Sequence, residues 1–331
     1  MTSPFRFLPL LGLSALLACA ATPALAQDAK TDAKVEADHN SLTFGIGGVY
    51  LPSYEGSNDY ILTPAIAARG KVHDFSFFTR NTQLYVNAIP SQSGPGVDFE
   101  LGPIIGVNFN RHTKLVDPQI KALGKRKLAA EAGGFIGIGK TGLITSDYDN
   151  LTVRVAYVHD ISGIYKSYVI TPQIQYTTPL SRKAFIGISA SADYAGTGYA
   201  TAYYDVDAAG ALRSGLPVFT GRKGWKQVTF GMIGGHSLTG DLLHGLGLYF
   251  TGSYSRLQND FAASPVTRIA GSPNQWFGAV GLVPASNQRK PPFRPNRPLT
   301  VVEVAPAHRL PGVQIRSRST CPSIASGWDR P

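Results

Sequence analysis

The feature that most constrains the fold is an alternation of apolar and polar residues along segments of roughly ten residues. Near the middle of the chain, for example, Leu151 and Val153 fall on one face while Thr152 and Arg154 fall on the other. A period of two is typical of a strand whose two faces meet different surroundings. The polar faces are rich in Gly, Ser, Thr and Gln, which suits the inside of a barrel whose outside meets lipid. The alternation therefore predicts an all-β fold, an antiparallel transmembrane β-barrel, because a closed barrel leaves no unpaired edge in lipid.

The segments that carry this pattern predict about twelve strands, and ten is the alternative count. Two long connections, 111–129 and 195–223, fall on the same side of the barrel. They are the third and fifth external loops, and 257–273 is the sixth. A soluble sandwich is the competing fold, but it would use strands of about 5–6 residues around an apolar core. The predicted strands are 41–51, 59–69, 72–79, 82–89, 97–110, 130–140, 150–159, 164–177, 182–194, 224–238, 242–256 and 274–282.

The charge of the chain is unevenly distributed, and this decides how it is interpreted. Only 16% of residues are charged, yet the formal net charge is +10. Residues 283–331 hold eight Lys and Arg against Glu303 and Asp329, together with nine of the 23 prolines. Because most of the basicity lies in this Pro-rich tail, it does not indicate a nucleic-acid-binding face.

The N-terminus predicts export from the cytoplasm. Residues 1–26 combine Arg6, an apolar stretch and an Ala-Leu-Ala site before Gln27, the pattern of a secretory signal peptide. The alternative is lipidation at Cys19, within a Leu-Leu-Ala-Cys sequence. We expect four parts: the signal peptide 1–26, a periplasmic segment 27–40, an outer-membrane barrel 41–282 and a Pro/Arg-rich tail 283–331, disordered, with the cell outer membrane as its location.

Two motifs suggest enzymes or nucleotides, and both have simpler interpretations. Residues 134–141 match the P-loop pattern, but their glycines alternate with Phe and Ile as in a strand. His39 and Ser41 have the spacing of a barrel lipase, yet the sequence shows no third group to orient the histidine. The histidines lack metal-ligand spacing. We therefore predict a chain that is not an enzyme, with no catalytic residue, cofactor, metal or nucleotide.

Several loop sequences resemble the MipA/OmpV family of outer-membrane barrels. The first is Tyr-Leu-Pro-Ser-Tyr-Glu-Gly-Ser at 50–57, and the others are Tyr203-Tyr204 with Ser-Gly-Leu-Pro at 214–217, Asp-Phe-Ala-Ala-Ser-Pro at 260–265, and Gly271-Ser272. The resemblance runs from about residue 41 to 282. Its loop signatures fall at ten positions, which look like loop-shaping residues and whose binding role is unknown: Tyr54, Glu55, Gly56, Ser214, Gly215, Leu216, Pro217, Asp260, Ser264 and Pro265.

The same resemblance implies a noncatalytic scaffold of the outer membrane. Its partners would be a lytic murein transglycosylase and a murein synthase, and a passive pore for small solutes is the alternative. The basic run 121–127 suggests contact with lipopolysaccharide, against a simple solvated loop. Membrane lipid would surround the barrel. Pro284 predicts a truncated closing strand, and we interpret 283–331 as an out-of-frame extension, with a genuine periplasmic tail as the alternative.

Overall fold

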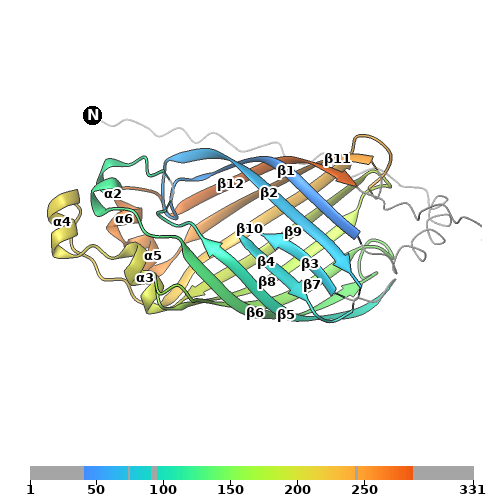
Figure 1. Ribbon diagram of the computed structural model, residues 1–331, viewed down its shortest axis with the longest axis horizontal. Coiled ribbons are helices and arrows are strands. Elements are labelled where there is room, and N and C mark those ends of the chain that lie inside the picture. Colours follow the sequence, from blue (N-terminus) through green and yellow to red (C-terminus); the bar gives the residue numbers. More distant parts are fainter. Residues whose placement is uncertain (1–40, 74, 91–94, 113, 243–244, 286–331) are drawn as a thin grey trace, which may run out of the picture. The chain divides into compact units, whose positions relative to one another are not determined.

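Twelve antiparallel strands form a closed barrel in the computed structural model, which describes residues 41–73, 75–90, 95–112, 114–242 and 245–285 (Figure 1). The predicted signal peptide, the segment 27–40, His39, Cys19 and the tail beyond residue 285 lie outside the described residues. The strands are β1 Ser41–Pro52, β2 Tyr60–Val72, β3 Phe75–Arg80, β4 Gln83–Asn87, β5 Gly96–Asn108, β6 Ala129–Thr141, β7 Asn150–Asp160, β8 Tyr168–Pro179, β9 Ala184–Ala195, β10 Gly224–Ser237, β11 Gly245–Leu257 and β12 Asn274–Ala285.

Each strand pairs with its neighbours in sequence, and the last strand closes the ring against the first. Ile46 of β1 lies opposite Leu282 of β12, and the pairing continues to Tyr50 opposite Gly278. The predicted count of twelve is confirmed, and so is the interpretation of the P-loop match, because 134–141 lie within β6 and pair with β5 and β7. The closed ring satisfies the strand backbones without an exposed final edge.

The prediction that the closing strand is truncated is wrong. Strand β12 extends to Ala285 and pairs with β11 along its whole length, with Pro284 opposite Leu246. Pro284 lies two residues beyond Leu282, the last residue that pairs with β1. Proline is tolerated at a position that pairs with only one neighbouring strand, because no second strand needs a hydrogen bond from its missing N–H.

The barrel is apolar outside and polar inside. The outward residues of the strands include Ile66, Phe99 and Ile136, which are 75%, 59% and 63% exposed. Buried polar residues on the inner face include Thr152 and Gln173. This is the inverse of a water-soluble core, and it confirms the predicted distribution, because lipid takes the apolar side chains outside.

Outward-facing aromatic residues gather near one end of the strands. Tyr50 stacks on Tyr60 with ring centroids 4.9 Å apart, and Tyr254 contacts Trp276 at the same separation. Two further pairs, Tyr194–Trp225 and Tyr157–Tyr168, lie at the same end of their strands. Such a belt is typical of the boundary between hydrocarbon and water.

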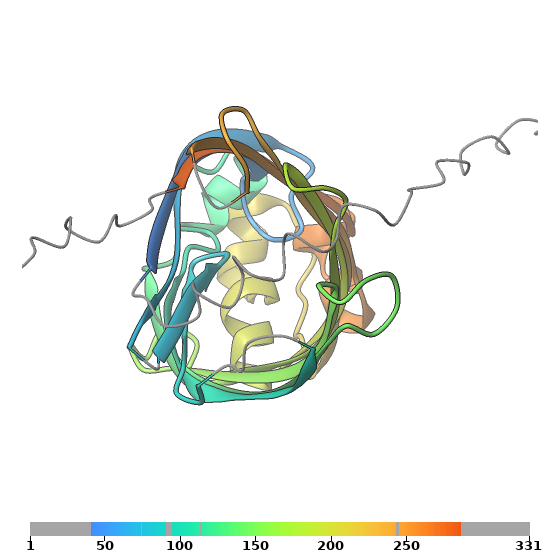
Figure 2. The same cartoon turned by 90° about the vertical axis from the view of Figure 1, so that its right-hand side faces the viewer.

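Three of the connections at this end carry short helices, which the strand pattern did not predict. They are α2 Pro118–Leu123, α3 Thr197–Tyr204, α4 Ala208–Ser214, α5 Asn259–Ala263 and α6 Pro265–Arg268. Figures 1 and 2 together show these helices gathered at one end, with α3 and α4 lying across the opening of the ring. We call the loops 53–59, 109–128, 196–223 and 258–273 the cap, and the opposite end, with its shorter connections, the turn end. Among the described residues, none of the helices has the length and apolarity needed to cross a membrane.

Candidate functional site

The cap has its own apolar core, to which all four of its loops contribute. Tyr54, Leu115, Leu216 and Val266 come from the four loops and are each at most 3% exposed. The Tyr54 hydroxyl lies 2.7 Å from the carbonyl oxygen of Ala270 and 3.2 Å from that of Val266. Burial raises the pKa of Tyr54 well above its usual value, so the residue remains a neutral hydrogen-bond donor. The loops therefore form one packed unit.

Glu55 connects this unit to the barrel wall. One of its carboxylate oxygens lies 2.5 Å from the Lys226 ammonium on β10, and the other accepts a hydrogen bond of 2.7 Å from the Tyr199 hydroxyl on α3. Asn110 donates to the same carboxylate and accepts from the Glu55 N–H. The Lys226 ammonium also lies 3.4 Å from Asp193 on β9. These charges are largely removed from water, so each depends on its partners.

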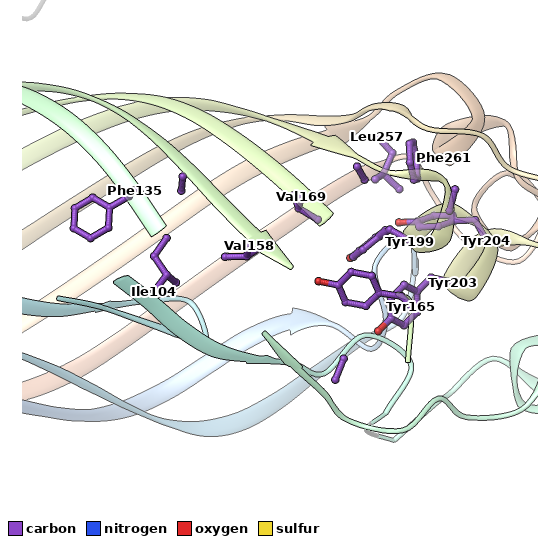
Figure 3. Close-up of a cluster of buried hydrophobic side chains, with 14 of the residues drawn as sticks. Ile104, Phe135, Val158, Tyr165, Val169, Tyr199, Tyr203, Tyr204, Leu257 and Phe261 are labelled. Carbon is purple, nitrogen blue, oxygen red and sulfur yellow. The ribbon is translucent and has the colours of Figure 1, made fainter. Parts of the chain in front are cut away.

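A layer of tyrosines lies where α3 of the cap meets the 161–167 loop (Figure 3). Tyr199 and Tyr203 of α3 contact each other with centroids 4.9 Å apart, and both contact Tyr165 of the 161–167 loop. The Tyr165 hydroxyl donates to Glu131 at 3.0 Å. Burial raises the pKa of each of these three tyrosines. Because Tyr199 and Tyr203 are at most 2% exposed, α3 fills the cap end of the lumen with packed side chains.

A second set of side chains meets inside the barrel. Arg154 of β7 lies 2.6 Å from Glu100 of β5, and its guanidinium stands over the rings of Phe78 and Phe135 at 5.0 and 5.6 Å. Arg80 of β3 donates to the side-chain oxygen of Gln173 on β8. In the ring, β3 and β8 are five strands apart, so this hydrogen bond spans the lumen.

The ten candidate positions from the loop sequences all lie in the cap. Gly56 has a φ of +99°, and a Cβ there would lie 2.7 Å from the Thr267 hydroxyl oxygen. Gly215 ends α4 in the left-handed region, and Leu216 beside it is 2% exposed. Ser214 is buried and donates to the carbonyl oxygen of Gly210, whereas Pro217 is exposed. Most of these positions thus shape the loops.

The remaining candidates belong to the last cap loop. The Ser264 hydroxyl caps the N-terminus of α6 and donates to the Tyr204 carbonyl at 2.6 Å, and Pro265 is the first residue of that helix. Asp260 pairs with Arg222 at 2.9 Å, and hydrogen bonding from Arg222 lowers the pKa of Asp260. The structure brings these residues together in a packed cap.

Arg111 is a buried cation that the sequence did not single out. It is 1% exposed, and its guanidinium donates to the carbonyl oxygens of Tyr203 and Gly124 at 3.1 and 2.9 Å. Burial, followed by the charge of Arg126, lowers the pKa of Arg111 to about 10. The guanidinium ties the 109–128 loop to α3. A contact between residues that are far apart in the chain leaves no local pattern by which the sequence could reveal it.

The arrangement of the cap residues offers packing and ion pairing. Among the described residues, no cluster of three or more His, Cys, Asp or Glu side chains could hold a metal ion. Ser41 begins β1, and its histidine neighbour in sequence, His39, lies outside the described residues. The Glu55 carboxylate is already engaged by Lys226, Tyr199 and Asn110.

These features define a twelve-stranded transmembrane-type barrel whose opening at one end is crossed by a helical cap (Figure 2). The family model described as MltA-interacting protein MipA matches residues 44–283, which is more than half of the chain. The chain belongs to this family, and the predicted resemblance is confirmed.

Comparison with solved structures finds outer-membrane expressed OmpT of Vibrio cholerae at 9% identity and a TM-score of 0.28, covering 75% of this chain and 98% of that one. An in-vitro folded form of OmpT, an outer-membrane protein of Vibrio cholerae, gives 8% identity, the same TM-score and the same coverage. At this TM-score neither comparison adds to the fold, which rests on the strand pairing. No curated protein matches the chain.

Proposed function

We propose that this chain is a noncatalytic barrel of the cell outer membrane that serves as a scaffold for the murein-synthesising machinery. Its turn end would face the periplasm and its cap the outside. The topology supports this orientation, because β1 begins at the turn end and the longer connections of such barrels are usually external.

The apolar outer surface supports residence in a membrane. Leu62, Ile66 and Ile136 are 76%, 75% and 63% exposed, which would be costly in water over so large a surface. The aromatic pairs near the cap, such as Tyr254 and Trp276, would then lie at the external interface.

The filled lumen is the observation that favours a structural role over the alternative of a passive pore. The tyrosine layer and the Arg154–Glu100 pair deeper in the barrel both narrow the path through it. Conduction requires a continuous aqueous route lined by groups that are free to exchange with solute. Here the charges of Arg154 and Glu100 are bound to each other, and Arg80 is bound to Gln173.

Support for the murein partners comes from the family's description as MltA-interacting protein, which indicates a lytic transglycosylase. Murein lies in the periplasm, so a scaffold would present its turn end to these enzymes. The 142–149 turn offers Ile144 and Tyr148, which are 65% and 42% exposed. Apolar side chains of this kind at a turn tip suit contact with a protein partner.

The test is affinity capture of the tagged full chain from envelope extract, at native expression, with quantification of the murein enzymes. We expect enrichment of a lytic murein transglycosylase, and a marked loss of it with Ile144→Asp/Tyr148→Asp. The matched control is Leu212→Asp/Val218→Asp, which places the same charges on exposed apolar residues of the cap. Recovery no greater than from untagged extract would contradict the scaffold. Equal losses from both variants would contradict docking at the turn end.

A further inference from the structure

The positive charge of the cap is concentrated in one loop. Residues 109–128 contain six Lys and Arg against a single acid, Asp117. By contrast, the 53–59 loop holds two acids and no Lys or Arg, the 196–223 loop holds three Lys and Arg against two acids, and the 258–273 loop holds one of each sign. The Asp117 carboxylate is engaged in capping α2, where it accepts from the Ile120 N–H at 2.9 Å. The loop therefore presents a local positive potential that the rest of the cap does not share.

This charge surrounds a depression in the surface. An open groove of about 610 Å³ is lined by His112, Lys114, Leu115, Lys121 and Lys125. The three lysines are exposed, whereas Leu115 at its base is 3% exposed and belongs to the cap core. Buried Ile120 and the Arg111 hydrogen bonds anchor the backbone on either side. The lysines thus project from a fixed loop, which lowers the cost of gathering them around one anion.

The groove borders the wall of the barrel that faces outward. The ring of Phe109 lies 6.1 Å from that of His112, which lines the groove. Phe109 follows β5 in the same outward row as Phe99 and Ile105, and it is 42% exposed. An anion in the groove would therefore sit where the barrel surface passes from the apolar wall to the cap.

We propose that this groove binds the phosphorylated headgroup of a glycolipid in the external leaflet, with its acyl chains against the outward faces of β5 and β6. Several phosphates on one headgroup match several ammonium groups around one groove, and each such contact is charge-assisted. A lipid is favoured over a soluble anion because the groove adjoins the apolar wall through Phe109. The assignment rests on the proposed membrane location and orientation, and it does not depend on the murein partners.

The test measures binding of fluorescent bisphosphorylated lipid A to the folded full chain in zwitterionic detergent, with dephosphorylated lipid A as the comparison. We expect the phosphorylated form to bind more tightly, and Lys114→Gln/Lys121→Gln/Lys125→Gln to weaken it by at least about tenfold. The matched control, Lys183→Gln/Lys223→Gln/Arg268→Gln, removes the same charge from exposed positions away from the groove and should change binding less than about twofold. Heat-modified gel migration confirms that each variant is folded.

Three outcomes would overturn the proposal. The first is equal binding of phosphorylated and dephosphorylated lipid, and the second is an equal loss in both triple variants, which would indicate general surface charge. The third is displacement of the lipid by inorganic phosphate at the same concentration, which would assign the groove to a soluble anion. Capture of murein enzymes is measured in a separate experiment. A negative result there would contradict the scaffold proposal and leave the lipid-binding result unaffected.

Discussion

The Lys226 ammonium on β10 lies 2.5 Å from the carboxylate of Glu55, which precedes it by 171 residues in the chain. Glu55 belongs to the first cap loop, and Lys226 lies at the cap end of the barrel wall. Their side chains are 18% and 7% exposed. The ion pair therefore holds the cap to the barrel in an environment with little water, where each charge depends on the other.

Loss of Lys226 should loosen the cap. In Lys226→Met, Glu55 and Asp193 both lose their cation, and breaking such a buried pair costs about 3–5 kcal/mol. We expect faster unfolding in detergent and faster proteolysis of the 53–59 loop. The double variant Glu55→Gln/Lys226→Met should recover part of the loss, because one unpaired charge is removed. Unchanged unfolding rates in the single variant would show that the pair does not hold the cap.

Gly56 should tolerate no side chain. Its φ of +99° disfavours other residues, and a Cβ would lie 2.7 Å from the Thr267 hydroxyl oxygen. Gly56→Ala is expected to cost about 1–3 kcal/mol, measured as a lower unfolding temperature. The control is Gly278→Ala in β12, where a Cβ meets nothing within 4 Å. If the two variants unfold alike, the conformation of Gly56 contributes nothing to the packing of the first loop.

The strands were predictable because residues that face lipid are apolar and residues that face the lumen are polar, so the two kinds alternate along each strand. Thus β7, predicted at 150–159, runs from Asn150 to Asp160. The helices were missed because α3, with the sequence TGYATAYY, has Gly, Thr and Tyr at positions where a strong helix former would be expected. Its formation depends on tertiary packing of Tyr199, Tyr203 and Tyr204 against the cap. The Asp117-Pro118 step at α2 was a readable capping signal.

The candidate site was predictable only in its local parts. Gly56 and Gly215 were marked by loop sequence, and both have the positive φ that favours glycine. The partners of Glu55 were not predictable, because Lys226 meets it only after the ring closes with a particular register. Arg111 was hidden for the same reason, since its acceptors are backbone carbonyls of Tyr203 and Gly124.

The 142–149 turn should respond to acid through Asp149. Its carboxylate is desolvated, yet hydrogen bonds from the N–H groups of Thr145, Leu143 and Ile144 and from the Tyr176 hydroxyl outweigh this and lower its pKa well below the usual range. A depressed pKa adds stability above the unfolded value of about 3.9, and this stability is lost as pH falls below it. We expect turn proteolysis to be constant from neutral pH to about pH 4 and to rise below that. In Asp149→Asn, cleavage at neutral pH should be faster and the rise below pH 4 weaker. An unaltered pH profile in the variant would contradict this role.

The lumen is crossed at two levels, by the tyrosine layer and, deeper, by the Arg154–Glu100 pair together with the Arg80–Gln173 hydrogen bond, so opening either level alone should not create a pore. Tyr203 lies in the tyrosine layer, and Arg154 lies deeper, paired with Glu100. In planar bilayers we expect near-baseline conductance for the natural chain, for Tyr203→Ala and for Arg80→Ala/Arg154→Ala, and a clear rise when all three substitutions are combined. The control Tyr254→Ala/Arg268→Ala removes an outward aromatic residue and an exposed cation, and it should stay closed because neither residue fills the lumen. Stable open channels in the natural chain would contradict a blocked lumen and would support a passive pore.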